Sequence, residues 1–293
     1  MFLRSPKNLK EYGSWALITG PTDGIGKALA FELASKGLNL VLVGRNPLKL
    51  EATSKEIRER FGEKVELKSV VVDLARFSGQ ELANLVEKET KGLDVGLLVN
   101  NAGLGYPYPR FFHEVDLELM EGIIKVNLEA ATWITLSVLP NMLRKKKGAI
   151  INIGSGSTMA IPSYPLYTVY AASKAYLAMF SRCISVEYKK QGIDVQCQIP
   201  LFVATKMTKL KATSFLIESP KSYSKASVRS MGYEHLSVPC WSHSVQWLIA
   251  NCLPDALLNW CVYWYFLGVN KKGKLKEAHL KKLQLQQNKS PIA

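Results

Sequence analysis

The chain has 293 residues, of which 47% are hydrophobic and 21% charged, a composition that is typical of a folded globular protein and excludes a disordered one. The 38 lysine and arginine residues outnumber the 24 aspartate and glutamate residues, so the formal net charge is +14, and phosphate-bearing ligands or an anionic membrane surface are favoured partners. Five cysteines without CxxC spacing predict reduced thiols. We expect no metal cofactor, and because no nucleic-acid-binding module is present we expect no nucleic-acid partner.

Short apolar runs alternate with helical patterns from residue 14 onward. Six runs are predicted to be strands: 15–19, 40–43, 68–73, 95–99, 149–153 and 193–199. Five segments between and after them are predicted to be helices: 27–36, 48–61, 79–90, 117–145 and 170–191. Continuous apolar strands separated by helices indicate a parallel sheet that is covered on both faces. We therefore predict an α/β fold, a Rossmann-type doubly wound parallel sheet with a helical C-terminal extension.

The same pattern predicts one main domain. The expected divisions are a lead-in at 1–13, a cofactor-binding and catalytic domain at 14–240 with a substrate lid at about 205–240, and a helical segment with a basic tail at 241–293. The most apolar stretch of the C-terminal region, Trp247–Gly268, is interrupted by Pro254 and Asp255. Because a bilayer span needs about 20 predominantly apolar residues, we predict two short helices there.

A glycine-rich loop, Thr19–Gly26, lies between the first predicted strand and the first predicted helix. Gly20 permits a tight turn, Gly24 lets the backbone approach a pyrophosphate, and Gly26 lets the helix pack closely on the strand. The helix N-terminus then offers free N–H groups to a phosphate. Because a strand precedes the motif and a helix follows it, we predict a dinucleotide site. The residues expected to contact the dinucleotide here are Gly20, Thr22, Asp23, Gly24, Ile25 and Gly26.

Arg45 follows the second predicted strand, where NAD-binding proteins usually carry a carboxylate that holds the ribose 2′-hydroxyl. An arginine suits a 2′-phosphate instead, because a guanidinium binds phosphate bidentately. The residue therefore favours NADPH as the cofactor, against the alternative of a surface arginine in a turn. Asp73, after the third strand, is a candidate for the adenine amino group or, alternatively, a cap for the next helix.

Tyr170 and Lys174 are spaced i, i+4 at the start of a predicted helix, so the phenol and the ammonium lie on one helix face. A tyrosine has an ordinary pKa of about 10, and a nearby cation lowers it toward the range that a general acid needs near neutral pH. The pair therefore predicts proton donation by Tyr170, with Lys174 as the supporting cation.

The chain resembles the classical short-chain dehydrogenase/reductase family over almost its whole length. The matching motifs are Thr19–Gly26, Asn100-Asn101-Ala102-Gly103, Asn127, Ser155 and Tyr170–Lys174. The resemblance implies that a serine orients a substrate carbonyl and that Tyr170 protonates its oxygen. It also implies that Lys174 holds the nicotinamide ribose and lowers the pKa of the tyrosine, while Asn127 keeps a water in the proton relay.

Two further segments are implied by this resemblance. Asn100, Asn101 and Ala102 belong to a segment after the fourth strand that would brace the sheet and line the adenosine side of the cofactor. Thr205, after the sixth strand, would flank the nicotinamide, although Leu201 stands where the family usually has a glycine.

The catalytic serine has two candidates. Counting forward from the strand residue Asn152 leads to Ser155, whereas counting back 13 residues from Tyr170, the common family spacing, leads to Ser157. Because a strand anchors its own end more firmly than a loop does, we predict Ser155, with Ser157 as the alternative. Tyr167 is not favoured as the proton donor, since the residue four positions after it is not a lysine.

Four segments resemble one subgroup, the very-long-chain 3-oxoacyl-CoA reductases and the plant form in particular, which are related to 17β-hydroxysteroid dehydrogenases. The segments are 12–26, 111–116, 187–190 and 203–207. The resemblance implies NADPH-dependent reduction of 3-oxoacyl-CoA to 3-hydroxyacyl-CoA in fatty-acid elongation, at the cytosolic face of the endoplasmic reticulum membrane. Elongase components and a second copy of the chain are expected partners. The alternatives are a reductase of a steroid or specialised-metabolite ketone and a non-catalytic scaffold of an elongase complex.

Residues after the sixth strand suit an acyl-CoA substrate, or else form a lid without particular selectivity. The lysines that would attract its phosphates are Lys206, Lys209 and Lys211. The apolar side chains that would line an acyl channel are Met207, Leu210, Phe215 and Leu216.

Membrane attachment has more than one interpretation. The subgroup normally carries an apolar anchor before the dinucleotide-binding domain, and this chain begins just after the point where that anchor would end, so a cytoplasmic protein is the alternative. The aromatic segment Trp241–Phe266, followed by Lys271-Lys272, is typical of a membrane interface, against the alternative of a helix pair packed beside the active site. The expected interfacial residues are Trp260, Trp264 and Phe266.

Overall fold

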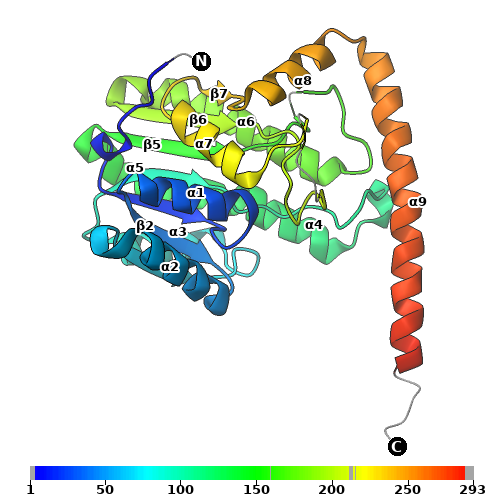
Figure 1. Cartoon of the computed structure of the whole chain (residues 1–293), viewed down its shortest axis with the longest axis horizontal. Coiled ribbons are helices and arrows are strands. Elements are labelled where there is room, and N and C mark those ends of the chain that lie inside the picture. The colour runs from blue at the N-terminus through cyan, green and yellow to red at the C-terminus, as the bar shows by residue number, and fades with distance from the viewer. Residues whose placement is uncertain (1–3, 159, 211–213, 215, 288–293) are drawn as a thin grey trace, which may run out of the picture.

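The computed structural model describes residues 4–158, 160–210, 214 and 216–287. Seven parallel strands form one sheet in the order β3-β2-β1-β4-β5-β6-β7 (Figure 1). Their bounds are β1 Trp15–Thr19, β2 Asn39–Gly44, β3 Leu67–Val71, β4 Val95–Asn100, β5 Gly148–Ile153, β6 Ile193–Gln198 and β7 Leu236–Ser237. The six predicted strands are confirmed, and the short β7 extends the sheet at one edge.

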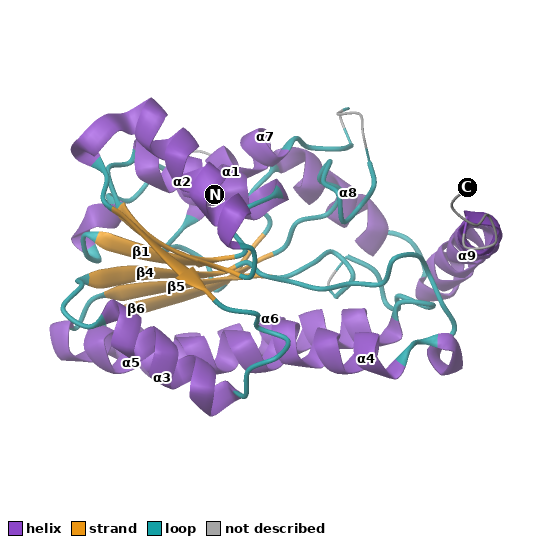
Figure 2. Cartoon of the chain, turned by 90° about the horizontal axis from the view of Figure 1, so that it is seen from below, coloured by secondary structure: helices purple, strands orange, loops and turns teal. Residues whose placement is uncertain are grey.

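Helices cover both faces of the sheet, which confirms the doubly wound fold. Figure 2 shows α1, α2 and α7 on one face and α3, α5 and α6 on the other. The bounds are α1 Gly24–Ser35, α2 Pro47–Phe61, α3 Gly79–Thr90, α4 Leu117–Ile124, α5 Ala130–Lys145, α6 Thr168–Tyr188, α7 Pro220–Ser230, α8 Trp241–Asn251 and α9 Asp255–Gln287. The strand order reverses between β1 and β4, and ligands of such sheets bind beyond the carboxyl ends of the strands at this point.

Each face of the sheet has its own apolar core. Successive side chains of a strand point to opposite faces, so Ile18 of β1 packs with Leu33 of α1, whereas Leu17 packs with Ile134 of α5. All four side chains are fully buried. The strands are therefore apolar on both sides, as their sequence indicates.

The stretch predicted as one helix over 117–145 is divided by a π-helical turn, Lys125–Glu129, between α4 and α5. Leu117–Lys145 is also the one helical stretch of the described residues that is long and apolar enough to cross a membrane, by length and composition. Half of its most apolar window is buried, and Ile134 and Val138 belong to the core against the sheet. We therefore interpret it as a core helix.

The C-terminal region differs from the two short helices predicted within Trp247–Gly268. The first, α8, ends at Asn251, but the second, α9, continues for 33 residues to Gln287 and projects beyond the body of the protein (Figure 1). Lysine, leucine, glutamate and glutamine, which favour helices, dominate its second half. The expected lid range 205–240 is divided as well, because α7 packs on the core with Tyr223 fully buried and β7 joins the sheet.

Candidate active site

The glycine-rich loop joins β1 to α1 at the carboxyl edge of the sheet. Gly20 and Gly24 have φ angles of +67° and +51°, which residues with a side chain rarely adopt. A Cβ on Gly26 would lie 2.1 Å from the carbonyl oxygen of Gly20, so α1 approaches the loop more closely than a side chain permits. The carboxylate of Asp23 caps α1 by accepting from the N–H of Gly24 at 2.8 Å. The loop has the form that a pyrophosphate-binding turn requires.

Asn101 connects this loop to the end of β4. Its Nδ2 donates to the carbonyl oxygens of Thr19 and Gly20 at 2.9 and 3.1 Å. In return, the hydroxyl of Thr19 accepts from the N–H groups of Asn101 and Ala102 at 3.0 and 2.9 Å. Asn101 therefore braces the glycine loop against the end of β4, and the hydroxyl of Thr19 is a partner that the sequence did not single out.

Asn100 lies within the sheet and the helical layer instead. Its Nδ2 donates to Oδ1 of Asn152 on β5 at 2.8 Å and to the hydroxyl of Thr135 on α5 at 3.1 Å. The residue is 4% exposed. Asn100 therefore braces β4 against β5 and α5. Ala102 instead lies beside the glycine loop, where its N–H donates to the hydroxyl of Thr19.

Tyr170 and Lys174 lie one turn apart near the start of α6, beside the end of β5. The Nζ of Lys174 donates to the carbonyl oxygen of Ile153 at 2.8 Å, and the residue is 4% exposed. The phenol of Tyr170, which is partly buried, shares a hydrogen bond with the side chain of Ser155. The structure thus brings a serine, a tyrosine and a lysine together at the carboxyl edge of the sheet.

The two serine candidates differ in their contacts. Ser155 bonds to Tyr170, and its hydroxyl also accepts from the N–H of Ser157 at 3.2 Å. Ser157 is buried, and its hydroxyl has no hydrogen-bond partner among the described residues. The position of Ser155 therefore agrees with the count from the strand.

Burial is the largest influence on the pKa of both Tyr170 and Lys174. Burial raises the pKa of Tyr170, and the hydrogen bond with Ser155 opposes that rise only in part. Burial also lowers the pKa of Lys174 to about 8. The ammonium of Lys174 is directed at the carbonyl of Ile153. The effect of Lys174 on the pKa of the phenol stays a prediction.

Asn127 lies in the π-helical turn and is fully buried. Its Oδ1 accepts from the N–H of Leu104 at 2.8 Å, and its Nδ2 donates to the Leu104 carbonyl at 3.0 Å and to the hydroxyl of Ser173 at 2.8 Å. A Cβ on Gly103 would lie 3.4 Å from Nζ of Lys174 and 3.7 Å from Oδ1 of Asn127. Both side chains therefore lie close to Gly103. Turns of this type are frequent at functional sites.

The adenosine end of the expected dinucleotide site carries a free cation. Arg45 is exposed in the turn after β2 and has no ion pair within the part of the chain that the structure describes. Asp73 accepts from the N–H of Ala75 at 3.1 Å, so it shapes its own turn, while Ser78 caps the following helix α3. Thr205 packs at the other end, where its methyl group lies 3.2 Å from the position of a Cβ on Gly24. The glycine loop and Thr205 fit a dinucleotide, and the guanidinium of Arg45 is exposed beside the end of β2.

Helix α9 contributes an aromatic side chain beside the catalytic group. Phe266 is 8% exposed and packs on Tyr164 and Tyr167, with ring centroids 4.7 and 5.1 Å apart. The ring of Tyr167 lies 6.4 Å from that of Tyr170. The predicted interfacial position of Phe266 is therefore wrong, because the side chain faces the site. Trp260 and Trp264 lie on the outer face, 62% and 54% exposed.

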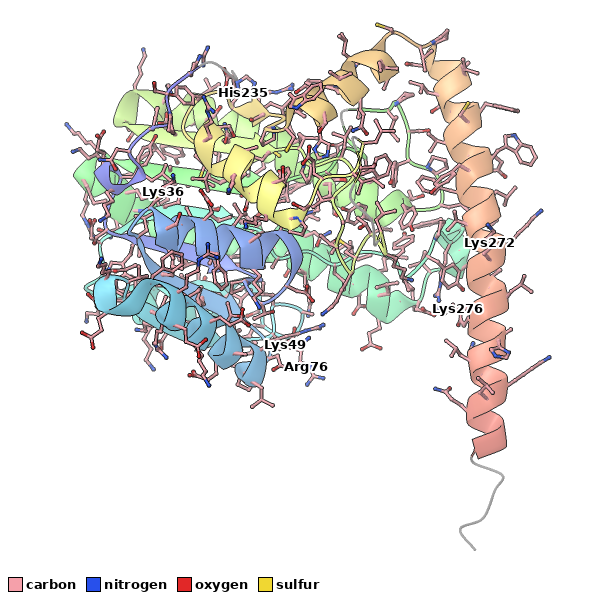
Figure 3. All side chains as sticks on the ribbon, viewed as in Figure 1. Lys36, Lys49, Arg76, His235, Lys272 and Lys276 are labelled. Carbon is pink, nitrogen blue, oxygen red and sulfur yellow. The ribbon has the colours of Figure 1, made fainter. Side chains whose placement is uncertain are left out.

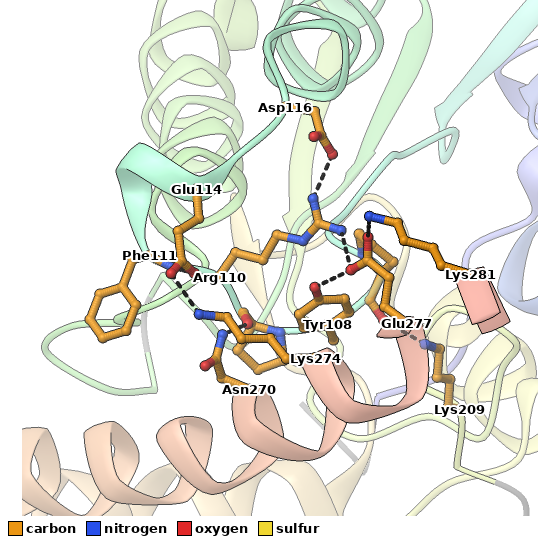
Figure 4. A network of polar contacts seen from close by, with 12 residues as sticks. Tyr108, Arg110, Phe111, Glu114, Asp116, Lys209, Asn270, Lys274, Glu277 and Lys281 are labelled. Atoms are coloured by element: carbon orange, nitrogen blue, oxygen red, sulfur yellow. Dashed lines mark hydrogen bonds and ion pairs between the residues drawn. The ribbon is translucent and has the colours of Figure 1, made fainter. Parts of the chain in front are cut away.

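A polar network holds α9 against the segment that follows β4 (Figure 4). Arg110, whose side chain is 10% exposed, pairs with Asp116 at 2.5 Å and with Glu277 of α9 at 3.2 Å. Tyr108 also donates a hydrogen bond to Glu277. Asn270 donates to the Pro109 carbonyl at 2.7 Å, and Lys274 pairs with Glu114 at 2.6 Å. The contacts with α9 could not be predicted from the sequence, because their partners are more than 150 positions apart.

The apolar residues expected to line an acyl channel are less enclosed than predicted. Met207 and Leu216 are each 52% exposed, and Leu210 is partly buried. Lys211 and Phe215 lie outside the described residues.

The sequence is similar to a known family and to several named proteins. A family model described as short chain dehydrogenase matches residues 14–214. A very-long-chain 3-oxoacyl-CoA reductase-like protein of Arabidopsis thaliana is 47% identical over 262 residues, which cover 88% of this chain and 83% of that protein. A human protein named inactive hydroxysteroid dehydrogenase-like protein 1 is 43% identical, with 86% and 76% covered. The human very-long-chain 3-oxoacyl-CoA reductase is 37% identical, with 88% and 80% covered.

Two solved structures have a similar fold. A 7β-hydroxysteroid dehydrogenase superposes with a TM-score of 0.77 at 25% identity, covering 87% of this chain and 99% of that one. A short-chain dehydrogenase from Sphingobium yanoikuyae in complex with NADPH has a TM-score of 0.67 at 27% identity, with 84% and 95% covered.

Proposed function

Because this chain belongs to the short-chain dehydrogenase family, we propose that it uses NADPH to reduce the 3-keto group of a 3-oxoacyl-CoA to a hydroxyl. The observation that carries the proposal is the contact of Ser155 with the phenol of Tyr170, one helical turn from the buried ammonium of Lys174. A protein that only bound partners would have no use for a proton donor placed beside a dinucleotide loop. Very-long-chain fatty-acid elongation is the process we assign to it.

The residues of the site divide the work of a carbonyl reduction. NADPH, when bound, would supply a hydride to the carbonyl carbon. Ser155 would donate a hydrogen bond to the carbonyl oxygen and hold it against Tyr170, whose phenol then donates its proton to that oxygen. Lys174 would hold the nicotinamide ribose, and the phenol would recover its proton through a water that contacts both Lys174 and Asn127.

The preference for NADPH over NADH rests on Arg45. Its guanidinium is exposed after β2 and has no carboxylate partner among the described residues, so it is available to a 2′-phosphate. The glycine loop, Thr22, Asp23, Ile25 and Asp73 would surround the rest of the dinucleotide. Asn100 supports them from within the sheet.

The substrate class rests on two supports. The first is the similarity to proteins named very-long-chain 3-oxoacyl-CoA reductase. The second is the excess of lysines beside the site, which suits a substrate that carries phosphates. A steroid ketone is the second candidate, since a hydroxysteroid dehydrogenase has a similar fold. A scaffold role is the third, since one similar protein is named inactive.

We also propose that the outer face of α9 lies on the cytosolic surface of the endoplasmic reticulum membrane. Trp260, Trp264 and Tyr265 are each more than half exposed on this face, and Lys271-Lys272 follows them. Aromatic side chains prefer the membrane interface, and lysines are attracted to anionic headgroups. Elongase components and a second copy of the chain remain proposed partners.

The test is turnover of purified protein with NADPH and two substrates side by side, a long-chain 3-oxoacyl-CoA and a steroid ketone. The proposal predicts NADPH oxidation with the CoA thioester and recovery of the 3-hydroxyacyl-CoA. Turnover of the steroid alone would assign the second candidate. NADPH binding without turnover of any ketone would favour the scaffold.

A further inference from the structure

A pocket of about 810 Å³ opens beside the glycine loop, and none of the predicted catalytic residues lines it. Its walls are the start of α1, the segment 204–210, the start of α7 and one side chain of α9. The charged side chains that line it are Asp23, Lys27, Lys206, Lys209, Lys221 and Lys276. Five lysines therefore face one carboxylate.

Two of these lysines are neutralised by carboxylates. Lys206 pairs with Asp23 at 2.6 Å, across the mouth of the glycine loop. Lys27 pairs with Glu56 of α2 at 2.8 Å. Asp23, the one carboxylate among the described residues that line the pocket, is thus already paired with Lys206 and does not neutralise the other lysines.

The remaining three lysines have no carboxylate partner in the described part of the chain. Lys209 donates to the neutral carbonyl of Pro107 at 2.5 Å, and neither Lys221 nor Lys276 takes part in an ion pair. The positive charges of these three lysines repel one another, and a bound anion would relieve that repulsion. An anion with several negative charges would therefore gain affinity from all three lysines. The pocket therefore suits a ligand with more than one phosphate.

Lys276 reaches this pocket because α9 is docked. Its neighbour Glu277 is held by Tyr108 and Arg110, so the network in Figure 4 also positions Lys276. The same network includes Lys209 through its bond to Pro107 (Figure 4). Two of the three free lysines are thus placed by contacts around the segment that follows β4.

We propose that this pocket binds the phosphate groups of the CoA part of the substrate, an inference that rests on the proposed reduction of 3-oxoacyl-CoA. CoA carries a pyrophosphate and a further phosphate on its ribose, which matches an extended cluster of cations. Gly24 borders the pocket, so the cofactor pyrophosphate at the glycine loop is the other source of phosphate. The experiment must separate these two sources.

The test compares two substrates and two variants. The double variant Lys221→Glu/Lys276→Glu reverses two free charges of the pocket. Lys272→Glu is the matched control, because Lys272 is exposed on the same helix and does not line the pocket (Figure 3). The substrates carry one 3-oxoacyl group on CoA or on N-acetylcysteamine, which has no phosphate. Calorimetry measures the affinity for CoA alone, and fluorescence measures the affinity for NADPH.

We expect the double variant to raise KM for the CoA thioester, and to weaken CoA binding, by about tenfold or more. KM for the N-acetylcysteamine thioester, NADPH affinity and the control variant should be unchanged. Equal losses with both thioesters, a parallel loss of NADPH affinity or the same effect in Lys272→Glu would overturn the assignment. If the wild-type protein reduces neither thioester, the proposed function fails, and CoA binding alone then decides whether the pocket binds CoA.

Discussion

Replacement of Lys174 by methionine should stabilise the protein and abolish its turnover. Burial lowers the pKa of this lysine to about 8 from an ordinary 10.5. At 1.36 kcal/mol per pKa unit, this disfavours the buried ammonium by about 3 kcal/mol. The variant also loses the hydrogen bond to Ile153, and leaving this buried carbonyl without its partner costs about 2 kcal/mol. A net gain of about 1 kcal/mol remains, which corresponds to a rise in Tm of about 2–4 °C.

The pH dependence identifies the cause of this gain. Because the folded-state pKa is depressed, the penalty is fully present below pH about 8 and disappears as the pH rises to 10.5. Thermal melting without cofactor should therefore show a larger difference between variant and wild type at pH 7 than at pH 10. A variant that is less stable than wild type at pH 7, or a difference that does not shrink at pH 10, would refute the reasoning. A variant that keeps its turnover would remove Lys174 from the site.

Three further changes test the cofactor, the serine and the membrane surface. Arg45→Asp should weaken NADPH binding and relatively favour NADH, and an unchanged preference in a titration of both cofactors would contradict the assignment of the 2′-phosphate. Ser155→Ala should lose most turnover, by about 10²-fold or more. Ser157→Ala should be mild, because its hydroxyl has no hydrogen-bond partner among the described residues; the reverse order would show that Ser157 orients the carbonyl. Replacing Trp260 and Trp264 by serine should reduce sedimentation with anionic vesicles, and equal sedimentation, or none by the wild-type protein, would exclude the proposed membrane face.

The local parts of the site could be predicted from the sequence because their physics is local. The turn at Gly20–Gly26 needs its glycines within one loop, and Tyr170 and Lys174 share a face through helical spacing alone. The count from β5 leads to the serine that contacts Tyr170 for a similar reason, since a strand end is a fixed reference. Alternating apolar runs were sufficient for the sheet.

The remaining parts depend on contacts between distant segments. Phe266 lies in an aromatic-rich stretch of the sequence, which suits either a membrane interface or a protein core. Only its packing on Tyr164 shows that the side chain is buried in the protein. Glu277 lies in a run of charged residues that indicates a solvated helix, yet it pairs with Arg110. The π-helical turn at Asn127 also has no signal in the apolar pattern, because the helix continues on both sides of it.

The central claim is that Tyr170 protonates a 3-keto group during NADPH-dependent reduction, and single-turnover NADPH oxidation with a long-chain 3-oxoacyl-CoA tests it most directly. The wild-type protein should oxidise NADPH and form the 3-hydroxyacyl-CoA. Tyr170→Phe, which keeps the ring and its packing, should slow the chemical step by about 10²–10⁴-fold while NADPH binding stays near normal. A Tyr170→Phe protein that retains more than about a tenth of the wild-type rate would contradict the claim and direct attention to Tyr167 as the donor.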